Sequence, residues 1–304
     1  MSTTYLTATH EFSSVIDFLR FGITQANIQQ LYYGHGTDNA WDDMLMLILG
    51  SLSLPVDVDP IVLHGQLTAK EKEYLCQQLS CRIEQKIPVP YLINKAYFCG
   101  LELYVDHRVL IPRSPIAELI SQQFSPWLEE GQVHRILDLC TGSGCIAIAC
   151  CHAFPEAKVD AVDISLDALD VAQINQRTYD LQDRLTLMAS DCFAALIDRR
   201  YDIIVSNPPY VGSDEMQTLP AEYLHEPNIA LEAASNGLAI VDKILADAAD
   251  YLTDHGILIV EVGNSAEALM AMYPDVPFLW FEFERGGHGV FMLTKQQLIE
   301  NFNR

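Results

Sequence analysis

Three aspartates and one asparagine follow apolar stretches along the chain. Asp138 precedes a glycine-rich turn, Asp163 and Asp191 follow the next two apolar stretches, and Asn207 ends a fourth within S-N-P-P-Y. Carboxylates favour cationic groups and accept hydrogen bonds from hydroxyls and amines. The amide oxygen of asparagine and the carbonyl of a proline accept N–H groups without removing a proton. These residue types therefore suit a ligand with a cationic end and hydroxyls, together with a substrate whose N–H groups must be oriented.

The S-N-P-P-Y motif, which ends at Tyr210, predicts a rigid acceptor site. Proline cannot donate a backbone hydrogen bond and holds its φ near about −65°, so the carbonyls here are free to face a substrate. Asn207 and the carbonyl of Pro208 can each take one N–H of a planar amide or arylamine and orient its lone pair. We expect Asn207 and Pro208 to be catalytic, and these two with Pro209 and Tyr210 to bind substrate. The alternative is a proline-rich turn beside a buried tyrosine.

The stretch I-L-D-L-C-T-G-S-G-C-I-A-I-A at 136–149 predicts a strand, a tight turn and a helix. Gly142 and Gly144 fit a dinucleotide fingerprint, with an acidic residue about 20 positions further on, so a nicotinamide or flavin enzyme is one alternative. Asp138 would repel a pyrophosphate, but it suits the ammonium and sulfonium groups of S-adenosylmethionine. We therefore expect S-adenosylmethionine to be bound by Asp138, Thr141, Gly142, Gly144, Asp163, Asp191 and Asn207.

Strand and helix patterns alternate in the C-terminal two thirds of the chain. Helices are expected near 144–153, 166–178 and 238–252. This rhythm is typical of right-handed βαβ units in an α/β protein with a parallel, doubly wound sheet. Strands are expected at Arg135–Leu139, Val159–Asp163, Leu185–Ala189, Tyr201–Ser206, Gly256–Val262, Phe278–Glu284 and Gly289–Leu293.

The organisation changes around residue 95. Before it, apolar clusters such as Val15–Leu19 and Met44–Leu49 have helical spacing, with breaks at Gly34–Asn39 and Pro55–Pro60. From Ala96 to Pro112 large apolar residues alternate around a Val-Asp-His-Arg break at 105–108, which suggests a short hairpin. We expect a helical domain at 1–94, a hairpin linker at 95–114 and a cofactor-binding domain at 115–304.

Composition limits the class of partner. The 304 residues carry a net charge of −23, from 41 acidic and 18 basic side chains, which argues against an ordinary DNA-binding protein. The eight cysteines show no spacing of a zinc site, so we expect no metal and a reducing compartment. The N-terminus lacks a basic leader, and no apolar run reaches the roughly 20 residues of a membrane span. A soluble cytoplasmic protein without a membrane partner or a stably bound nucleic acid is expected.

Three motifs together resemble the protein-glutamine methyltransferases that modify release factors and ribosomal proteins. They are F-x-G-x-x-x-x-V-x-x-x-V-L-I-P-R at 98–113, D-L-C-T-G-S-G-C at 138–145 and V-S-N-P-P-Y at 205–210. The resemblance implies a seven-stranded, Rossmann-like class I methyltransferase sheet with an antiparallel last strand. It also implies a small helical N-terminal domain, joined by a β-hairpin, that recognises the protein substrate. Asn207 and Pro208 would bind the glutamine amide.

Release-factor enzymes of this family usually read I-P-R-P-E-T-E, whereas Ser114 and Pro115 stand here at the Pro and Glu positions. This variant, with G-H-G-T-D-N-A-W at 34–41 and V-P-Y-L-x-N-K-A-x-F-C-G at 89–100, is closer to the branch that methylates large-subunit ribosomal protein L-three. His288, where the family often has aspartate, is interpreted as a turn substitution.

The expected substrate is thus a glutamine of a basic ribosomal protein, with a release factor as the first alternative. The negative charge would attract such a partner, or it serves only solubility. A DNA adenine methyltransferase also carries the N-P-P-Y motif, and a cofactor-binding module without catalysis is a third possibility. A long polar loop at 222–227 either closes over the substrate or merely connects.

Overall fold

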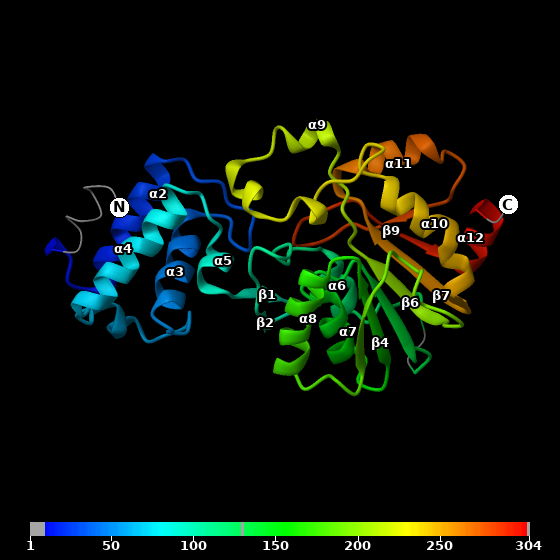
Figure 1. The fold of residues 1–304 in the computed structure, drawn as a ribbon, viewed down its shortest axis with the longest axis horizontal. Coiled ribbons are helices and arrows are strands. Elements are labelled where there is room, and N and C mark those ends of the chain that lie inside the picture. The colour runs from blue at the N-terminus through cyan, green and yellow to red at the C-terminus, as the bar shows by residue number, and fades with distance from the viewer. Residues whose placement is uncertain (1–9, 129–130, 303–304) are drawn as a thin grey trace. The chain divides into compact units, whose positions relative to one another are not determined.

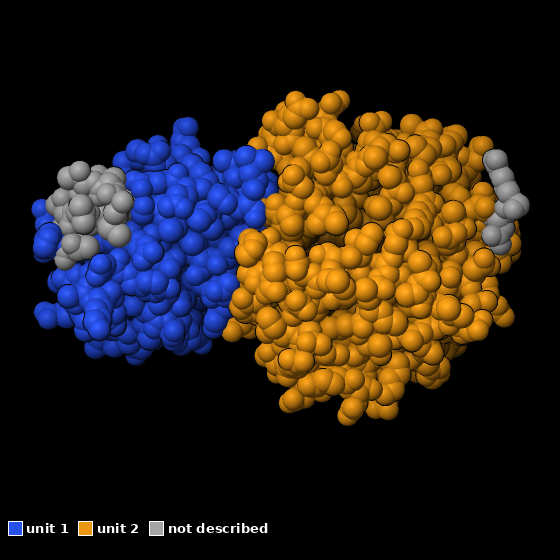
Figure 2. Space-filling model, in the orientation of Figure 1, with its two compact units in different colours: residues 1–96, 220–225 blue, residues 97–219, 226–304 orange. Residues whose placement is uncertain are grey.

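The computed structural model describes residues 10–128 and 131–302. It consists of two compact units (Figure 2). The helical unit comprises Met1–Ala96 and Pro220–His225, and the sheet unit comprises Tyr97–Leu219 and Glu226–Arg304. The expectation that the N-terminus lacks a basic leader concerns residues 1–9, which lie outside the described residues.

The helical unit packs its helices around one apolar core. That core includes Phe18, Met44 and Leu79, all fully buried. Two of the helices begin at capping boxes, in which the Ser14 and Thr68 hydroxyls satisfy free N–H groups of the first turn. The predicted helical module is confirmed, and its elements are α2 (Val15–Ile28), α3 (Ala40–Ser51), the 3₁₀ helix η1 (Pro60–His64), α4 (Ala69–Ile83) and α5 (Val89–Ile93).

A short segment from the second half of the chain belongs to this helical unit. It contains the 3₁₀ helix η2 (Ala221–His225). The Glu222 carboxylate accepts hydrogen bonds from the Tyr32 N–H at 3.0 Å and from Arg82 Nη1 at 3.3 Å. Arg82 is 2 % exposed and also pairs with Asp43 at 2.8 Å. The polar loop expected at 222–227 is therefore anchored through a buried ion-pair network.

A two-stranded hairpin contains β1 (Ala96–Phe98) and β2 (Leu101–Leu103). Its turn falls at Cys99 and Gly100, so the turn expected at 105–108 is wrong. The Asp106 side chain instead accepts the Arg108 N–H at 3.0 Å, which is a local turn stabilised by a side chain. This contact leads the chain out of the hairpin rather than back along it.

The sheet unit is built on seven strands in the order β5-β4-β3-β6-β7-β9-β8. Figure 1 labels β4, β6, β7 and β9 of this sheet. The first five pair in parallel, and β9 runs antiparallel to both β7 and β8. The chain runs from β3 outward to β5 and then returns to the other side of β3 with β6, which places the topological switch point between β3 and β6. The strands are β3 (Arg135–Leu139), β4 (Lys158–Asp163), β5 (Leu185–Ala189), β6 (Tyr201–Ser206), β7 (Leu252–Glu261), β8 (Leu279–Trp280) and β9 (Val290–Thr294).

Two apolar cores lie against this sheet. One includes Ile116, Ile120 and Ile148, and the other includes Val241, Ile244 and Leu298. Helices α6 (Ile116–Ser121) and α7 (Cys145–Ala153) contribute to the first core, and α10 (Ala239–Tyr251) and α12 (Lys295–Phe302) contribute to the second. The other helical elements are α8 (Leu166–Thr178), α9 (Ser213–Met216), η3 (Asn228–Ala230), η4 (Gly263–Ser265) and α11 (Ala266–Met272).

The expected α/β fold, its antiparallel last strand and the three helices are confirmed. The strand expected at Phe278–Glu284 is wrong in its extent, because β8 has only two residues. Beyond it, the backbone N–H groups of Glu284 and Arg285 donate to the Glu118 carboxylate at 3.1 and 2.9 Å, which leads the chain away from the sheet. Across residues 10–128 and 131–302, no helix has the length and apolar character that a membrane crossing requires.

Candidate active site

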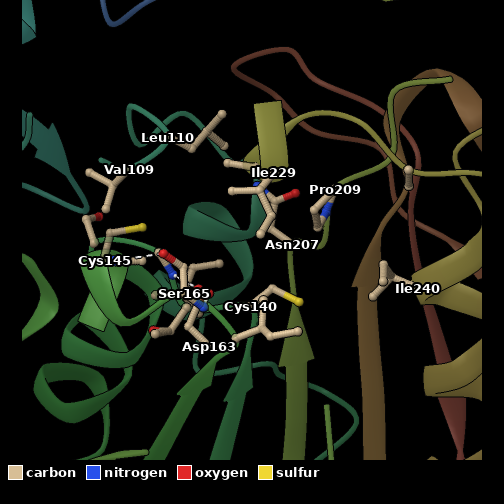
Figure 3. A pocket seen from close by; sticks show the side chains of 18 of the residues that line it. Val109, Leu110, Cys140, Cys145, Asp163, Ser165, Asn207, Pro209, Ile229 and Ile240 are labelled. Atoms are coloured by element: carbon tan, nitrogen blue, oxygen red, sulfur yellow. Dashed lines mark hydrogen bonds between the residues drawn. The ribbon is translucent and has the colours of Figure 1, made fainter. Parts of the chain in front are cut away.

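A cavity of about 380 Å³ opens at the carboxyl ends of β3, β4 and β6 (Figure 3). Ligands of open α/β sheets bind at this edge, beside the switch point. Five of the seven residues expected to bind cofactor line the cavity, as does Pro209 of the proline motif. The five are Thr141, Gly142, Asp163, Asp191 and Asn207. The structure thus brings together residues from four separate strand ends.

The glycine-rich turn joins β3 to α7 along one side of the cavity. The Thr141 N–H donates to the carbonyl of Val162, and the Gly142 N–H donates to Asp163 Oδ2 at 2.8 Å. Gly142 has a φ of +55°, and a Cβ added there would meet nothing within 4 Å. Its backbone therefore faces open space that a ligand can occupy closely. Gly144, which does not line the cavity, is the residue before the first turn of α7.

Asp138 lies behind this turn and is fully buried. Its Oδ2 accepts hydrogen bonds from Thr141 Oγ1 at 2.6 Å and from the Ala147 N–H at 3.1 Å. Its Oδ1 accepts none from the described part of the chain. Burial raises the pKa of Asp138 to about 7, against the two hydrogen bonds that lower it. An unpaired buried carboxylate oxygen is unusual, and a cationic ligand group nearby would compensate it.

Asp163 closes β4 at the mouth of the same turn. Its second oxygen accepts the Ser165 N–H at 2.9 Å, and burial raises its pKa above the ordinary range. The next residue, Ile164, also lines the cavity and was missed by the sequence reasoning, although its apolar type beside an acid was visible. Asp191 is more open: its side chain is 54 % exposed and pairs with Lys243 at 2.6 Å. Asp138 and Asp163 are therefore the two less exposed carboxyl groups beside the glycine-rich turn, and Asp191 is the open one.

The proline motif follows β6 directly. The Ser206 hydroxyl donates to the Leu139 carbonyl at 2.9 Å, which ties the end of β6 to β3. The Oδ1 atom of Asn207 is buried and accepts no hydrogen bond from any described residue. Asn207 and Pro209 line the cavity, whereas Pro208 and Tyr210 do not. An oriented and unsatisfied acceptor at a cavity wall is suited to a donor on a substrate.

Two further segments contribute to the walls of the cavity. Val109 and Leu110 come from the segment after the hairpin, and Ile229 comes from the segment after η2 (Figure 3). The two loops are joined by Glu226, whose carboxylate accepts both Arg113 Nη1 at 2.7 Å and Nη2 at 2.8 Å as well as the Ile111 N–H at 2.9 Å. Sequence reasoning noted Glu226 only as part of a polar loop, since its partner lies 113 positions away.

The donors of this site fit S-adenosylmethionine. The buried Asp138 carboxyl would favour its cationic end, the Gly142 backbone lies beside open space, and Asp163 can accept ribose hydroxyls. The sheet, its switch point and this set of side chains define an S-adenosylmethionine-dependent class I methyltransferase. In agreement, the family model "Methyltransferase small domain" matches residues 119–232.

Similar proteins of known name identify the family within this class of methyltransferases. Two proteins named ribosomal protein uL3 glutamine methyltransferase are similar over nearly the whole chain. The one from Francisella tularensis is 44 % identical over 94 % of this chain and 92 % of its own length. The one from Neisseria meningitidis serogroup B is 45 % identical over 96 % of both. The chain belongs to the ribosomal protein uL3 glutamine methyltransferase family.

A solved structure supports the fold alone. The catalytic domain of hMettl16, solved in complex with the MAT2A 3′UTR hairpin 6, covers 74 % of this chain and 81 % of its own with a TM-score of 0.51. It is only 15 % identical in sequence.

Proposed function

We propose that this protein transfers a methyl group from S-adenosylmethionine to the side-chain amide nitrogen of a glutamine in ribosomal protein uL3. The observation that carries the proposal is that Asn207 lines the cavity and that its buried Oδ1 has no donor among the described residues. Membership of the uL3 family supplies the substrate. The glutamine amide supplies the missing N–H.

The chain's own residues divide the work between cofactor and substrate. When bound, S-adenosylmethionine supplies an electrophilic methyl group on a sulfonium. Asp138 and Asp163 favour its cationic and hydroxyl-bearing parts, and Thr141, Gly142 and Gly144 form the turn that it approaches. We assign Asp191, the most exposed of the three acids, to the adenine amino group.

The amide nitrogen of glutamine is a weak nucleophile because its lone pair is delocalised. Asn207 Oδ1 and the carbonyl of Pro208 each accept one N–H of the amide, so the nitrogen is held with its lone pair directed at the methyl group. Both acceptors would also stabilise the positive charge that develops on nitrogen as the N–CH3 bond forms and the S–CH3 bond breaks. S-adenosylhomocysteine is then the leaving group, and one N–H proton of the methylated amide is released to solvent. Pro209 keeps this backbone rigid, and we assign Tyr210, which does not line the cavity itself, to substrate binding.

The helical domain expected at 1–94 selects the protein substrate, and the hairpin linker at 95–114 connects it to the methyltransferase domain at 115–304. We place the reaction in the cytoplasm, where ribosomal proteins are made. The eight cysteines support this compartment, since all of them are free thiols. The acidic charge favours a basic protein over nucleic acid as the partner.

A competition experiment tests the substrate. Labelled cofactor is offered with free uL3, a release factor, assembled ribosomes and DNA, and the labelled residue is located by mass spectrometry. We expect label on one glutamine of uL3, and none once that glutamine is replaced by asparagine, which shortens the side chain by one methylene. Label on the release factor or on DNA, with uL3 unmodified, would contradict the proposal.

A further inference from the structure

Tyr210, the last residue of the proline motif, is held by the segment that ends β7. Its hydroxyl donates to Glu261 Oε1 at 2.9 Å, and its carbonyl accepts the Ser265 hydroxyl at 2.8 Å. Its ring lies against Gly263, where an added Cβ would come within 2.6 Å of the Tyr210 Cε2 atom. Segment 261–265 therefore contacts the hydroxyl, the ring and the backbone of this one residue.

Glu261 is the polar centre of these contacts. It is 5 % exposed, and its second oxygen accepts the Ser114 hydroxyl at 2.5 Å. Each oxygen of a buried carboxylate is thus satisfied by one hydroxyl. Burial raises the pKa of Glu261, while the two hydroxyls and the nearby positive charge of Arg113 act in the opposite direction. Such an arrangement orders both of its partners, because either hydroxyl left alone in this environment would lose its acceptor.

The Ser114 contact depends on the residue type at this position. A proline at this position would have no hydroxyl to donate. Ser114 Oγ also accepts the Ile116 N–H at 3.2 Å, so the side chain is fixed from both sides. The bond to Glu261 is therefore a feature that a proline at this position would remove.

We propose that Glu261 is a positioning residue for methyl transfer, which holds Tyr210 through its hydroxyl with Ser114 as the second anchor. Tyr210 follows Pro208 by two residues and is joined to it through the rigid Pro209. Fixing the tyrosine therefore fixes the backbone that presents the two amide acceptors. The inference rests on the proposed function, because the acceptors matter only if a glutamine amide binds there.

A double-mutant cycle tests it. Glu261→Gln keeps the shape of the side chain but leaves only one acceptor oxygen, and Tyr210→Phe removes one hydroxyl. We expect each to lower kcat for uL3 by roughly 10- to 100-fold, with the cofactor Kd changed less than about twofold. The double variant should be no slower than the slower single variant. Glu282→Gln, an exposed acid of the same unit, is the matched control and should behave as wild type.

Two kinetic results would overturn the proposal. One is additive losses in the double variant, which would mean that the two side chains act separately. The other is an unchanged kcat per folded enzyme with lowered thermal stability alone, which would reduce Glu261 to a structural role. Ser114→Ala should lower kcat less than Glu261→Gln does. Ser114→Thr keeps the hydroxyl and should therefore have a kcat close to that of the wild type.

Hydrogen exchange followed by mass spectrometry gives a readout that needs no substrate. Backbone amides of 210–216 should exchange faster in Glu261→Gln and Tyr210→Phe than in wild type, and equally fast in both. If wild-type enzyme leaves uL3 unlabelled, the proposed function fails while this measurement still reports the contact. Unchanged exchange in both variants would refute the positioning role even if uL3 is methylated.

Discussion

Replacing Asp138 by asparagine should stabilise the protein without cofactor and weaken cofactor binding, and the stabilisation should grow with pH. The Asp138 carboxyl is fully buried, and burial raises its pKa from the ordinary value of 3.8 to about 7. The folded protein therefore binds a proton that the unfolded chain releases. The stability that this proton provides is complete below pH 3.8 and is lost as the pH rises to about 7.

The size of this destabilisation follows from the pKa shift of Asp138. Each pKa unit corresponds to about 1.4 kcal/mol, so the ionised carboxylate destabilises the folded protein by up to about 4 kcal/mol above pH 7. Between pH 5 and pH 8 the wild type should lose about 3 kcal/mol through this group, and the variant should not. Asparagine keeps an oxygen for the donors Thr141 and Ala147, so the neutral contacts survive. Other acids titrate in both proteins and largely cancel in the difference.

The assay is urea unfolding of both proteins at several pH values between 5 and 8. Asp202→Asn is a matched control, because this buried acid accepts hydrogen bonds from His134, Arg135 and Thr253 and has both oxygens in use. It should destabilise at every pH. Titration calorimetry in buffers of different ionisation enthalpy measures cofactor affinity and proton release. Wild type should release a proton on binding near pH 6.5, and Asp138→Asn should release less.

A stability difference between wild type and Asp138→Asn that stays flat from pH 5 to pH 8 would refute the reasoning. The carboxylate would then be compensated within the protein itself. Equal cofactor affinity of the two proteins would separately remove the role of Asp138 in binding the cationic end.

Four other perturbations separate the parts of the molecule. Asn207→Ala should lose about 3 kcal/mol of transition-state stabilisation with little change in cofactor affinity, measured as kcat and as Kd; a large loss of cofactor affinity with normal turnover of the bound complex would oppose this. Asp163→Ala should weaken cofactor binding and leave turnover of the bound complex nearly unchanged. A normal cofactor Kd in this variant would count against the role of Asp163. Glu222→Ala leaves Arg82 buried with one carboxylate fewer and should destabilise the helical unit by about 3 kcal/mol in urea, whereas an unchanged midpoint would show the pair to be dispensable. The rate of association with uL3 should fall as salt rises, and a rate independent of salt would exclude electrostatic steering.

Much of the sheet unit was predictable from local sequence. The bounds of β5, β6 and α8 agree with those expected from the apolar patterns, because buried strands and amphipathic helices are encoded by neighbouring residues. The convergence of Thr141, Gly142 and Asp163 with Asn207 was predictable as well. Parallel strands end at one edge of a sheet, so residues that follow them meet there.

The contacts that hold the site together were not predictable in this way. Tyr210 was expected to bind substrate, but nothing in the local sequence indicated that its hydroxyl donates to Glu261, which lies 51 positions further along the chain. Glu222 pairs with Arg82 from 140 positions away, which places part of a loop in the helical unit. Such pairs join single side chains across the fold and leave no periodic pattern.

The sequence by itself therefore determined the class of chemistry. A carboxylate before a glycine turn and an amide before two prolines have few other uses on consecutive strand ends. Only the tertiary structure decided that Asp138 lies behind the cavity with one oxygen that no described residue pairs with, and that Glu261 and Glu226 contact the loops around it. The physical reason is burial: whether a polar atom is satisfied depends on which distant donor the fold brings within hydrogen-bonding distance.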